Sequence, residues 1–221
     1  MATSGETPVL YSYWRSSCSW RVRIGLAWKG IEYANKPVHL LTDGGEHLKE
    51  EFTKMNPNQR LPALIIDGHT LTQSAAILEY LEETHPEKPL LPTDPLQRAQ
   101  VRTICQIIGA DIQPIQNLAV MNKVVEDLPA EEKAAQKVAW GKFWIQRGFV
   151  GLEQELARTA GKFCVGDTIT MADLFLEPQV YNANRFGVDM SQFPVISRIS
   201  AELSQLAEFQ AAHPSNQPDA Q

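Results

Sequence analysis

Residues 8–85 alternate between short strand patterns and helix patterns, and this alternation limits the possible folds more than any other feature of the chain. The stretch PVLYSYW is rich in Val, Leu and aromatic residues and predicts a strand; from Ser17 the apolar spacing becomes helical and ends at a C-cap, Gly30. A weaker strand pattern, YANKPVHL, and a short helix pattern, LKEEFTKMN, follow. The first three patterns form a βαβ unit, whose strands run parallel with a right-handed crossover.

The next stretch, LPALIIDGHTLTQS, predicts a β-hairpin. Ala63–Ile66 forms the first strand, Asp67-Gly68 favours the positive φ angles of a two-residue turn, and Thr70–Thr72 forms the returning strand. A helix, SAAILEYLEETH, begins at Ser74. The order β-α-β-α-β-β-α, with the last two strands as a hairpin, is the thioredoxin-like order.

The strand patterns end at a proline-dense stretch, PEKPLLPTDP, with four prolines in residues 86–95. This density blocks both a helix and a central strand. Helical patterns follow over Pro95–Val125, with an interruption at DIQPIQN, over Glu131–Ala160, and in PVISRISAELSQL. We therefore expect an α/β domain, a linker and an all-helical domain, over residues 1–86, 87–95 and 96–221 respectively.

The C-terminal part carries one strong local signal and one weak one. In GDTITMADLFL, Thr170 and Asp173 fit a capping box, and Ile169 and Leu174 take the flanking positions of a hydrophobic staple. The final residues, HPSNQPDAQ, are expected to be disordered, as chain ends often are.

Composition excludes several classes of protein. A formal net charge of −6 and a pI of about 5.4 argue against a protein that coats nucleic acid. No apolar run approaches the roughly 20 residues that span a bilayer, and MATSGETP lacks the regions of a secretory signal. Cys18, Cys105 and Cys164 are odd in number and widely spaced, which argues against a disulfide framework. We expect a cytoplasmic protein with no nucleic-acid or membrane partner.

The stretch YSYWRSSCSWRVRI carries the first candidate chemistry. Ser16, Ser17 and Cys18 lie in the first turn of the predicted helix, where hydroxyl and free backbone N–H groups either cap the helix or bind an anion. A dithiol redox cycle is excluded because Arg21 stands where a second cysteine would be needed. A metal site is not expected, because the five histidines show no ligand spacing with the cysteines.

Two further stretches complete a candidate site. The proline of Leu61-Pro62 enters a strand, which suggests a cis bond that leaves the Leu61 backbone free to pair with an extended peptide; an ordinary trans proline is the alternative. Gln73 and Ser74 start another helix and can hold a carboxylate, unless Ser74 is only an N-cap. Together the three stretches describe one cleft that fits a small peptide with a free carboxylate and a thiol.

The thioredoxin-like half, the proline-rich linker and the helical half together resemble the glutathione transferases. Within them, SSCSWRVRI after YSYW is similar to the signature of the zeta class, whose best-known activity is maleylacetoacetate isomerase. The resemblance runs from Pro8 to Pro218 and includes NPNQRLPAL, LEYLEETHP, LLPTDPLQRA, IQPIQNLAV, CVGDTITMADL and PQVYNANRF. It implies a thioredoxin-like N-terminal domain followed by a helical glutathione-transferase C-terminal domain.

By matching positions, the resemblance implies a set of site residues. Those expected to bind glutathione are Ser16, Ser17, Cys18, His47, Leu61, Pro62, Gln73, Ser74, Gln113 and Asn117. Ser16, Ser17 and Cys18 also form the expected catalytic group, with Ser16 as the main activator of the glutathione thiol. His47 stands where related sequences often have a glutamine, and an imidazole can also hydrogen-bond. Arg185, in NANRF, matches the arginine that the family places near the substrate's carboxylate.

The resemblance implies glutathione-dependent isomerisation of maleylacetoacetate to fumarylacetoacetate by reversible thiolate addition, in tyrosine and phenylalanine breakdown. It also implies transferase and α-haloacid dehalogenating side activities, a diacid substrate and a homodimer. The alternatives are a general detoxifying glutathione transferase and a non-catalytic interaction module. Of Arg15, Arg21 and Arg23, we expect at least one to be solvated or ion-paired on the outer face of the first helix.

Overall fold

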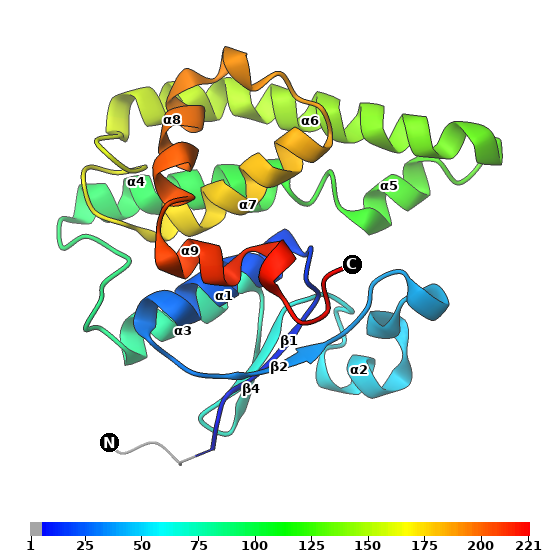
Figure 1. Cartoon of the computed structure of the whole chain (residues 1–221), viewed down its shortest axis with the longest axis horizontal. Helices are drawn as coiled ribbons and strands as arrows, with labels where there is room; N and C mark the ends of the chain where they lie inside the picture. The colour runs from blue at the N-terminus through cyan, green and yellow to red at the C-terminus, as the bar shows by residue number, and fades with distance from the viewer. Residues whose placement is uncertain (1–5) are drawn as a thin grey trace. The chain divides into compact units, whose positions relative to one another are not determined.

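The computed structural model describes residues 6–221, and the chain forms two compact units. The first unit contains the chain up to Pro89 together with Leu206–Gln221, and the second contains Leu90–Gln205. Figure 1 shows the strands and the first helices of the first unit in blue to cyan, and the helices of the second unit in green to orange. The predicted fold class, an α/β thioredoxin-like part followed by a helical part, is confirmed.

The first unit is built on a four-stranded sheet with the order β2-β1-β3-β4. Its strands are β1 (Val9–Ser12), β2 (Ala34–Pro37), β3 (Ala63–Ile66) and β4 (His69–Thr72). Strands β1 and β2 are parallel, whereas β3 is antiparallel to both β1 and β4. The hairpin turn has φ 52° at Asp67 and 75° at Gly68, so the predicted β-hairpin and its turn are confirmed.

The α-helices in the described part of the first unit are α1 (Ser17–Lys29), α2 (Glu50–Met55), α3 (Ser74–Thr84) and α9 (Ala207–Ala212). Helix α1 ends at Gly30 with φ 69°, a left-handed conformation that glycine adopts without strain, and this agrees with the predicted C-cap. Leu10, Ile24, Leu64 and Ile77 are fully buried and form the core between the sheet and the helices. Two 3₁₀ turns between β2 and α2, Thr42–Gly44 and Glu46–Leu48, carried no signal in the sequence.

The C-terminal segment is ordered, so the expectation of a disordered tail is wrong. Helix α9 packs against α1, as the red and blue ribbons in Figure 1 show, and a 3₁₀ turn, η5 (Pro214–Asn216), follows it. Gln217 closes this segment, because its Nε2 donates to the carbonyls of Ala211 and His213 at 3.0 Å each. The domain boundaries at residues 86 and 95 stay a prediction, although Leu206–Gln221 packs with the first unit.

The second unit consists of helices α4 (Pro95–Gln106), α5 (Leu118–Val124), α6 (Ala130–Thr159), α7 (Met171–Arg185) and α8 (Pro194–Leu203). The predicted interruption at DIQPIQN is present. It begins with one turn of π-helix, η3 (Ile107–Ile112), in which the Gln113 N–H donates to the Ile108 carbonyl at 2.9 Å. Gly148 of α6 makes room for this turn, because a Cβ there would collide with the side chain of Ile112.

The capping box predicted at the start of α7 is confirmed. The Asp173 carboxylate accepts from the Thr170 N–H at 2.8 Å, from the Thr170 hydroxyl at 2.9 Å and from the Cys164 N–H at 2.9 Å. Burial raises the pKa of Asp173, and these three donors act in the opposite direction by stabilising the carboxylate.

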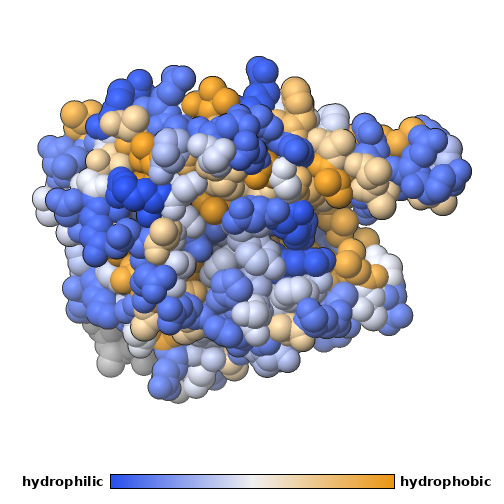
Figure 2. All heavy atoms as spheres, turned by 45° about the horizontal axis from the view of Figure 1, so that its top comes forward, coloured by the Kyte–Doolittle hydropathy of each residue, from blue (hydrophilic) through white to orange (hydrophobic). Residues whose placement is uncertain are grey.

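Among residues 6–221, no helix combines the length and the apolar character that crossing a membrane requires. On the face drawn in Figure 2, hydrophobic residues lie in separate patches among hydrophilic ones. Helix α6 carries several exposed apolar side chains, namely those of Val138, Phe143 and Val150.

A half-buried carboxyl group links α7 to α8. The Ser200 hydroxyl donates to Oε2 of Glu177 at 2.6 Å. Burial raises the pKa of Glu177 to about 7, because desolvation disfavours the ionised form more than the single donor stabilises it. The side chain is therefore partly protonated in the native state near neutral pH.

We predict that Glu177→Gln stabilises the protein in alkaline but not in acidic solution. The native state keeps the Glu177 proton up to a pKa of about 7, whereas the unfolded chain releases it near 4.5. Wild-type stability therefore falls as pH rises through this window and stays low above it, by about 3 kcal/mol at most. Denaturant unfolding at pH 4 and pH 8 measures the difference, and Glu202→Gln is the control because Glu202 is exposed. Equal gains at both pH values would contradict the prediction.

Candidate active site

The register of the sheet brings the three candidate stretches to one edge. Tyr11 of β1 pairs with Ala63 of β3, and Ala63 also pairs with Thr72 of β4, both in antiparallel ladders. The residues that follow β1, those that precede β3 and those that follow β4 therefore lie at the same end of the sheet. This end holds the starts of α1 and α3.

Ser16 is the N-cap of α1, and its Oγ accepts from the Ser19 N–H at 3.2 Å. The first intrahelical bond joins the Trp20 N–H to the Ser16 carbonyl at 2.9 Å, so the N–H groups of Ser17 and Cys18 precede it and point out of the helix end. Capping uses a lone pair of the Ser16 hydroxyl and leaves its hydrogen free to donate. Helix capping and anion binding are therefore compatible roles for this serine.

The Leu61-Pro62 peptide bond is cis, as predicted. The loop before it is held by Asn56, which is 2% exposed. The Nδ2 group of Asn56 donates to the Arg60 carbonyl at 2.7 Å, and its Oδ1 accepts from the Asn58 N–H at 3.1 Å. A buried amide therefore sets the path of the chain into β3.

Gln73 is the N-cap of α3 and adopts φ 69° with ψ 114°, a backbone conformation that residues other than glycine rarely adopt. Residues in such conformations often lie at functional sites. The first intrahelical bond runs from the Ile77 N–H to the Gln73 carbonyl at 3.0 Å, so the N–H of Ser74 lies free at the helix end. The buried Ser74 hydroxyl accepts from Nη1 of Arg21 at 3.3 Å, which links α3 to α1.

The three arginines do not lie where the sequence suggested. Arg21 and Arg23 are 2% and 1% exposed, and half-buried Arg15 lies with its guanidinium carbon 5.0 Å from the centre of the Trp14 ring. The expected position on the outer face of α1 is wrong for Arg21 and Arg23, because α1 is covered on almost all sides, and Arg15 precedes this helix. The signal was the run of apolar residues around the arginines, which leaves no polar face on the helix.

His47 lies in the second 3₁₀ turn of the first unit and is half-buried. Burial, and then the positive charge of Arg60, lower its pKa and favour the neutral imidazole. Among the described residues, its Nδ1 is buried and has no hydrogen-bond partner. An unsatisfied buried ring nitrogen fits a polar ligand, but its contact with glutathione stays a prediction.

Three predicted site residues belong to the second unit. Gln113 is half-buried and follows the π turn, and Asn117 caps α5 by accepting from the Ala119 N–H at 3.4 Å. Arg185 is the last residue of α7, is exposed, and lies with its guanidinium carbon 4.7 Å from the centre of the Phe186 ring. Their part in a ligand site stays a prediction.

The first unit has the fold of the N-terminal half of a glutathione transferase, and the family model described as "Glutathione S-transferase, N-terminal domain" matches residues 7–83. The maleylacetoacetate isomerase of Dictyostelium discoideum is 53% identical over 213 residues, which cover 96% of each chain. A bacterial zeta-class maleylpyruvate isomerase is 41% identical with a TM-score of 0.91, covering 96% of this chain and 100% of the other.

A third relative adds a ligand. The maleylacetoacetate isomerase of Anaeromyxobacter dehalogenans 2CP-1, crystallised with dicarboxyethyl glutathione and citrate in its active site, is 44% identical with a TM-score of 0.84. It covers 97% of this chain, which in turn covers 98% of it. The chain belongs to the family of maleylacetoacetate isomerases and zeta-class glutathione transferases, and the resemblance found in the sequence is confirmed.

We predict that Gln73→Gly is more stable than Gln73→Ala, although both remove the same amide. Alanine has a Cβ, which at φ 69° costs about 1 kcal/mol of conformational free energy, whereas glycine has none and avoids this cost. Thermal denaturation of the two variants measures the difference. Equal melting temperatures would show that the turn before α3 relaxes when its side chain is shortened.

Proposed function

We propose that this protein is a glutathione-dependent isomerase that converts maleylacetoacetate to fumarylacetoacetate in tyrosine and phenylalanine breakdown. The observation that carries the proposal is the sheet register, which gathers the starts of α1 and α3 and the residues before β3 at one edge. The family to which the chain belongs supports the choice of reaction.

The residues at this edge fit glutathione. The N–H groups at the start of α3, with Gln73 and Ser74, suit a carboxylate at the positive end of the helix dipole. The backbone of Leu61 suits an extended peptide, and the buried, unsatisfied Nδ1 of His47 suits a polar group. The first turn of α1 itself contains no acidic residue that would repel a thiolate.

Bound glutathione supplies a thiolate that adds to the cis alkene and leaves again after the resulting single bond has rotated. A free thiol with a pKa of about 8.5 is only a few per cent ionised at pH 7, so the site must favour the thiolate. The Ser16 hydroxyl donates to the sulfur while its lone pair caps α1, and the N–H groups of Ser17 and Cys18 add the field of the helix end. No general base acting on the carbon skeleton is required.

By the family resemblance, Arg185 binds a carboxylate of the diacid and orients the alkene, and Gln113 and Asn117 contact glutathione. A planar guanidinium suits this task because it pairs with a carboxylate through two parallel hydrogen bonds. The relative from Anaeromyxobacter dehalogenans supports the same chemistry, since dicarboxyethyl glutathione carries a dicarboxylic acid skeleton on its sulfur. A site of this kind also displaces halide from small α-haloacids.

A panel of substrates tests the reaction itself. We expect rapid conversion of maleylacetoacetate with glutathione and slow conjugation of aryl halides. Fast turnover of aryl halides with none of maleylacetoacetate would favour a general detoxifying transferase instead, and no affinity for glutathione would favour a non-catalytic module.

We further propose a cytoplasmic homodimer, on the basis of the family resemblance. The exposed apolar side chains of Val138, Phe143 and Val150 on α6 are available to a second copy of the chain. Sedimentation of the purified protein distinguishes one copy from two.

We predict that Ser16→Ala raises the apparent pKa of the bound glutathione thiol by about one to two units. The lost hydrogen bond to a charged sulfur is worth about 1.5–3 kcal/mol. Ultraviolet titration of the thiolate measures the shift. Ser16→Gly is the control for capping, because glycine caps a helix almost as well but carries no hydroxyl. Ser16→Thr should restore the low pKa, and an unchanged pKa in Ser16→Ala would exclude Ser16 as the activator.

We predict that Arg185→Ala lowers kcat/KM for the diacid about ten- to a hundredfold and leaves glutathione affinity unchanged. One charge-assisted hydrogen-bonded pair is worth about 1.5–3 kcal/mol. Steady-state kinetics with each substrate varied in turn measure this effect. Arg198→Ala is a matched control, because that exposed guanidinium donates to the Gly161 and Lys162 carbonyls. A loss in glutathione affinity alone would contradict the assigned role.

A further inference from the structure

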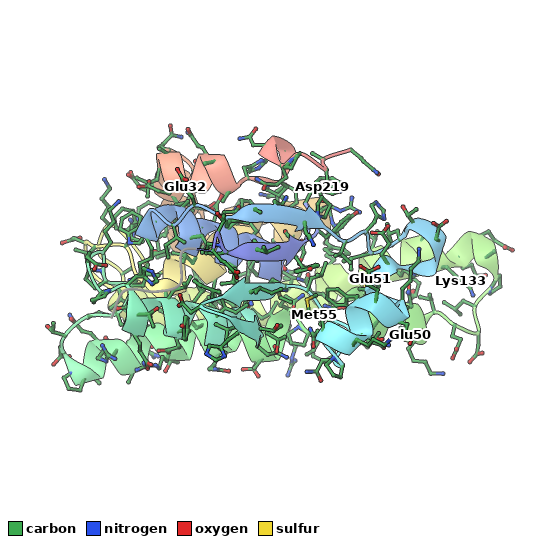
Figure 3. The ribbon with its side chains drawn as sticks, turned by 90° about the horizontal axis from the view of Figure 1, so that it is seen from below. Glu32, Glu50, Glu51, Met55, Lys133 and Asp219 are labelled. Atoms are coloured by element: carbon green, nitrogen blue, oxygen red, sulfur yellow. The ribbon has the colours of Figure 1, made fainter. Side chains whose placement is uncertain are left out.

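Two side chains hold the backbone of Trp14, one at its N–H and one at its carbonyl. Its N–H donates to Oδ2 of Asp219 at 2.9 Å, and its carbonyl accepts from Nη2 of Arg23 at 2.9 Å. Asp219 lies 205 residues further along the chain, in the C-terminal segment labelled in Figure 3. An anionic acceptor and a cationic donor thus hold the two successive peptide groups on either side of the Trp14 Cα.

Arg23 also forms hydrogen bonds to the two residues before Trp14 and to the end of α9. Its Nη1 donates to the Ser12 hydroxyl at 2.9 Å and to the Tyr13 carbonyl at 3.4 Å, and its Nε donates to the Ala212 carbonyl at 3.1 Å. The side chain is 1% exposed and therefore has little freedom to move. It joins the end of β1 to the end of α9.

Trp14 lies inside the turn Tyr13–Ser16, which precedes α1. The Ser16 N–H donates to the Tyr13 carbonyl at 2.9 Å and closes this turn, and Trp14 lies between the two residues. The position of the Ser16 hydroxyl therefore depends on the same carbonyls and N–H group that Arg23 and Asp219 hold. Among the described residues, Ser16 itself makes no hydrogen bond to the C-terminal segment; the bonds to that segment come from Trp14 and Arg23.

We propose that Asp219 and Arg23 are positioning residues for the thiol-activating Ser16, and that the C-terminal segment thereby sets the reactivity of bound glutathione. The inference rests on the proposed function, because it uses the role of Ser16 there. Neither side chain is assigned a contact with substrate or glutathione. Their effect on the reaction passes through the N–H and the carbonyl of Trp14.

The test compares three variants of the full chain. Asp219→Ala removes the acceptor of the Trp14 N–H, and Asp219→Asn keeps an acceptor oxygen without the charge. Asp67→Asn is the matched control, because Asp67 also lies in the first unit and accepts a hydrogen bond, from the Tyr80 hydroxyl at 2.7 Å, but does not touch the Ser16 turn.

Two measurements are made on each variant. Amide hydrogen exchange of Trp14, without any ligand, reports whether the peptide is held. Ultraviolet titration of bound glutathione reports the apparent thiol pKa. We expect faster exchange at Trp14 in Asp219→Ala and a thiol pKa raised by about half to one unit, which is an acid dissociation constant about three- to tenfold lower. Asp219→Asn should stay close to wild type in both, and Asp67→Asn should lose only thermal stability.

Each contrary result has a distinct meaning. Unchanged Trp14 exchange in Asp219→Ala would show that Asp219 does not hold the Trp14 N–H. Faster exchange with an unchanged thiol pKa would show that the C-terminal segment has only a structural role. A thiol pKa as high in Asp219→Asn as in Asp219→Ala would show that the hydrogen bond does not position Ser16. If the wild type binds no glutathione, the proposed function fails and this inference fails with it. Trp14 exchange would still show whether Asp219 holds the Trp14 N–H.

Discussion

The buried guanidinium of Arg23 joins the end of β1, the turn before α1 and the end of α9 in the first unit. Arg23 is 1% exposed, and burial lowers its pKa to about 10, so the group remains charged at neutral pH. Removing a charge from water costs several kcal/mol unless polar groups replace the solvent. Here the hydroxyl of Ser12 and three backbone carbonyls do so, and the carboxylate of Asp219 adds an opposite charge nearby. The path of the chain from β1 to α1 therefore depends on Arg23.

The candidate site uses backbone groups more than side chains. The starts of α1 and α3 lie at one end of the sheet, so their unpaired N–H groups and helix dipoles favour negative charge there. Side chains then refine the site: Ser16 caps α1 and retains a free hydroxyl hydrogen, and Arg21 connects α1 to Ser74. A pre-formed arrangement of this kind stabilises an anion without reorganisation when the anion forms.

In the second unit, irregular backbone is supported by unusually close packing. The π turn before Gln113 fits because Gly148 has no side chain to meet Ile112. The indole N–H of Trp140 donates to the Ile115 carbonyl at 2.9 Å and satisfies one of the carbonyls that the interruption frees. Two residues of α6 thus determine the shape of the segment that carries Gln113 and Asn117.

Local signals in the sequence were sufficient for much of the fold. The Gly30 C-cap, the Asp67-Gly68 turn and the capping box of Thr170 with Asp173 each depend on residues within three positions of one another, and all are present. The 3₁₀ turns after β2 and the helix α9 were not found, because neither has a local capping or periodic signal strong enough to separate it from a loop.

The sequence by itself determined the order of strands and helices, the family, and the residue types available at the helix starts. Hydrophobic periodicity, turn chemistry and a family signature are all read from neighbouring residues. Only the tertiary structure decided what the arginines of α1 and the C-terminal segment do. Arg23 donates to Ala212, 189 residues away, and the Trp14 N–H donates to Asp219, 205 residues away. Whether a charge is solvated or buried depends on which distant segment covers it, and no local pattern of residues carries that information.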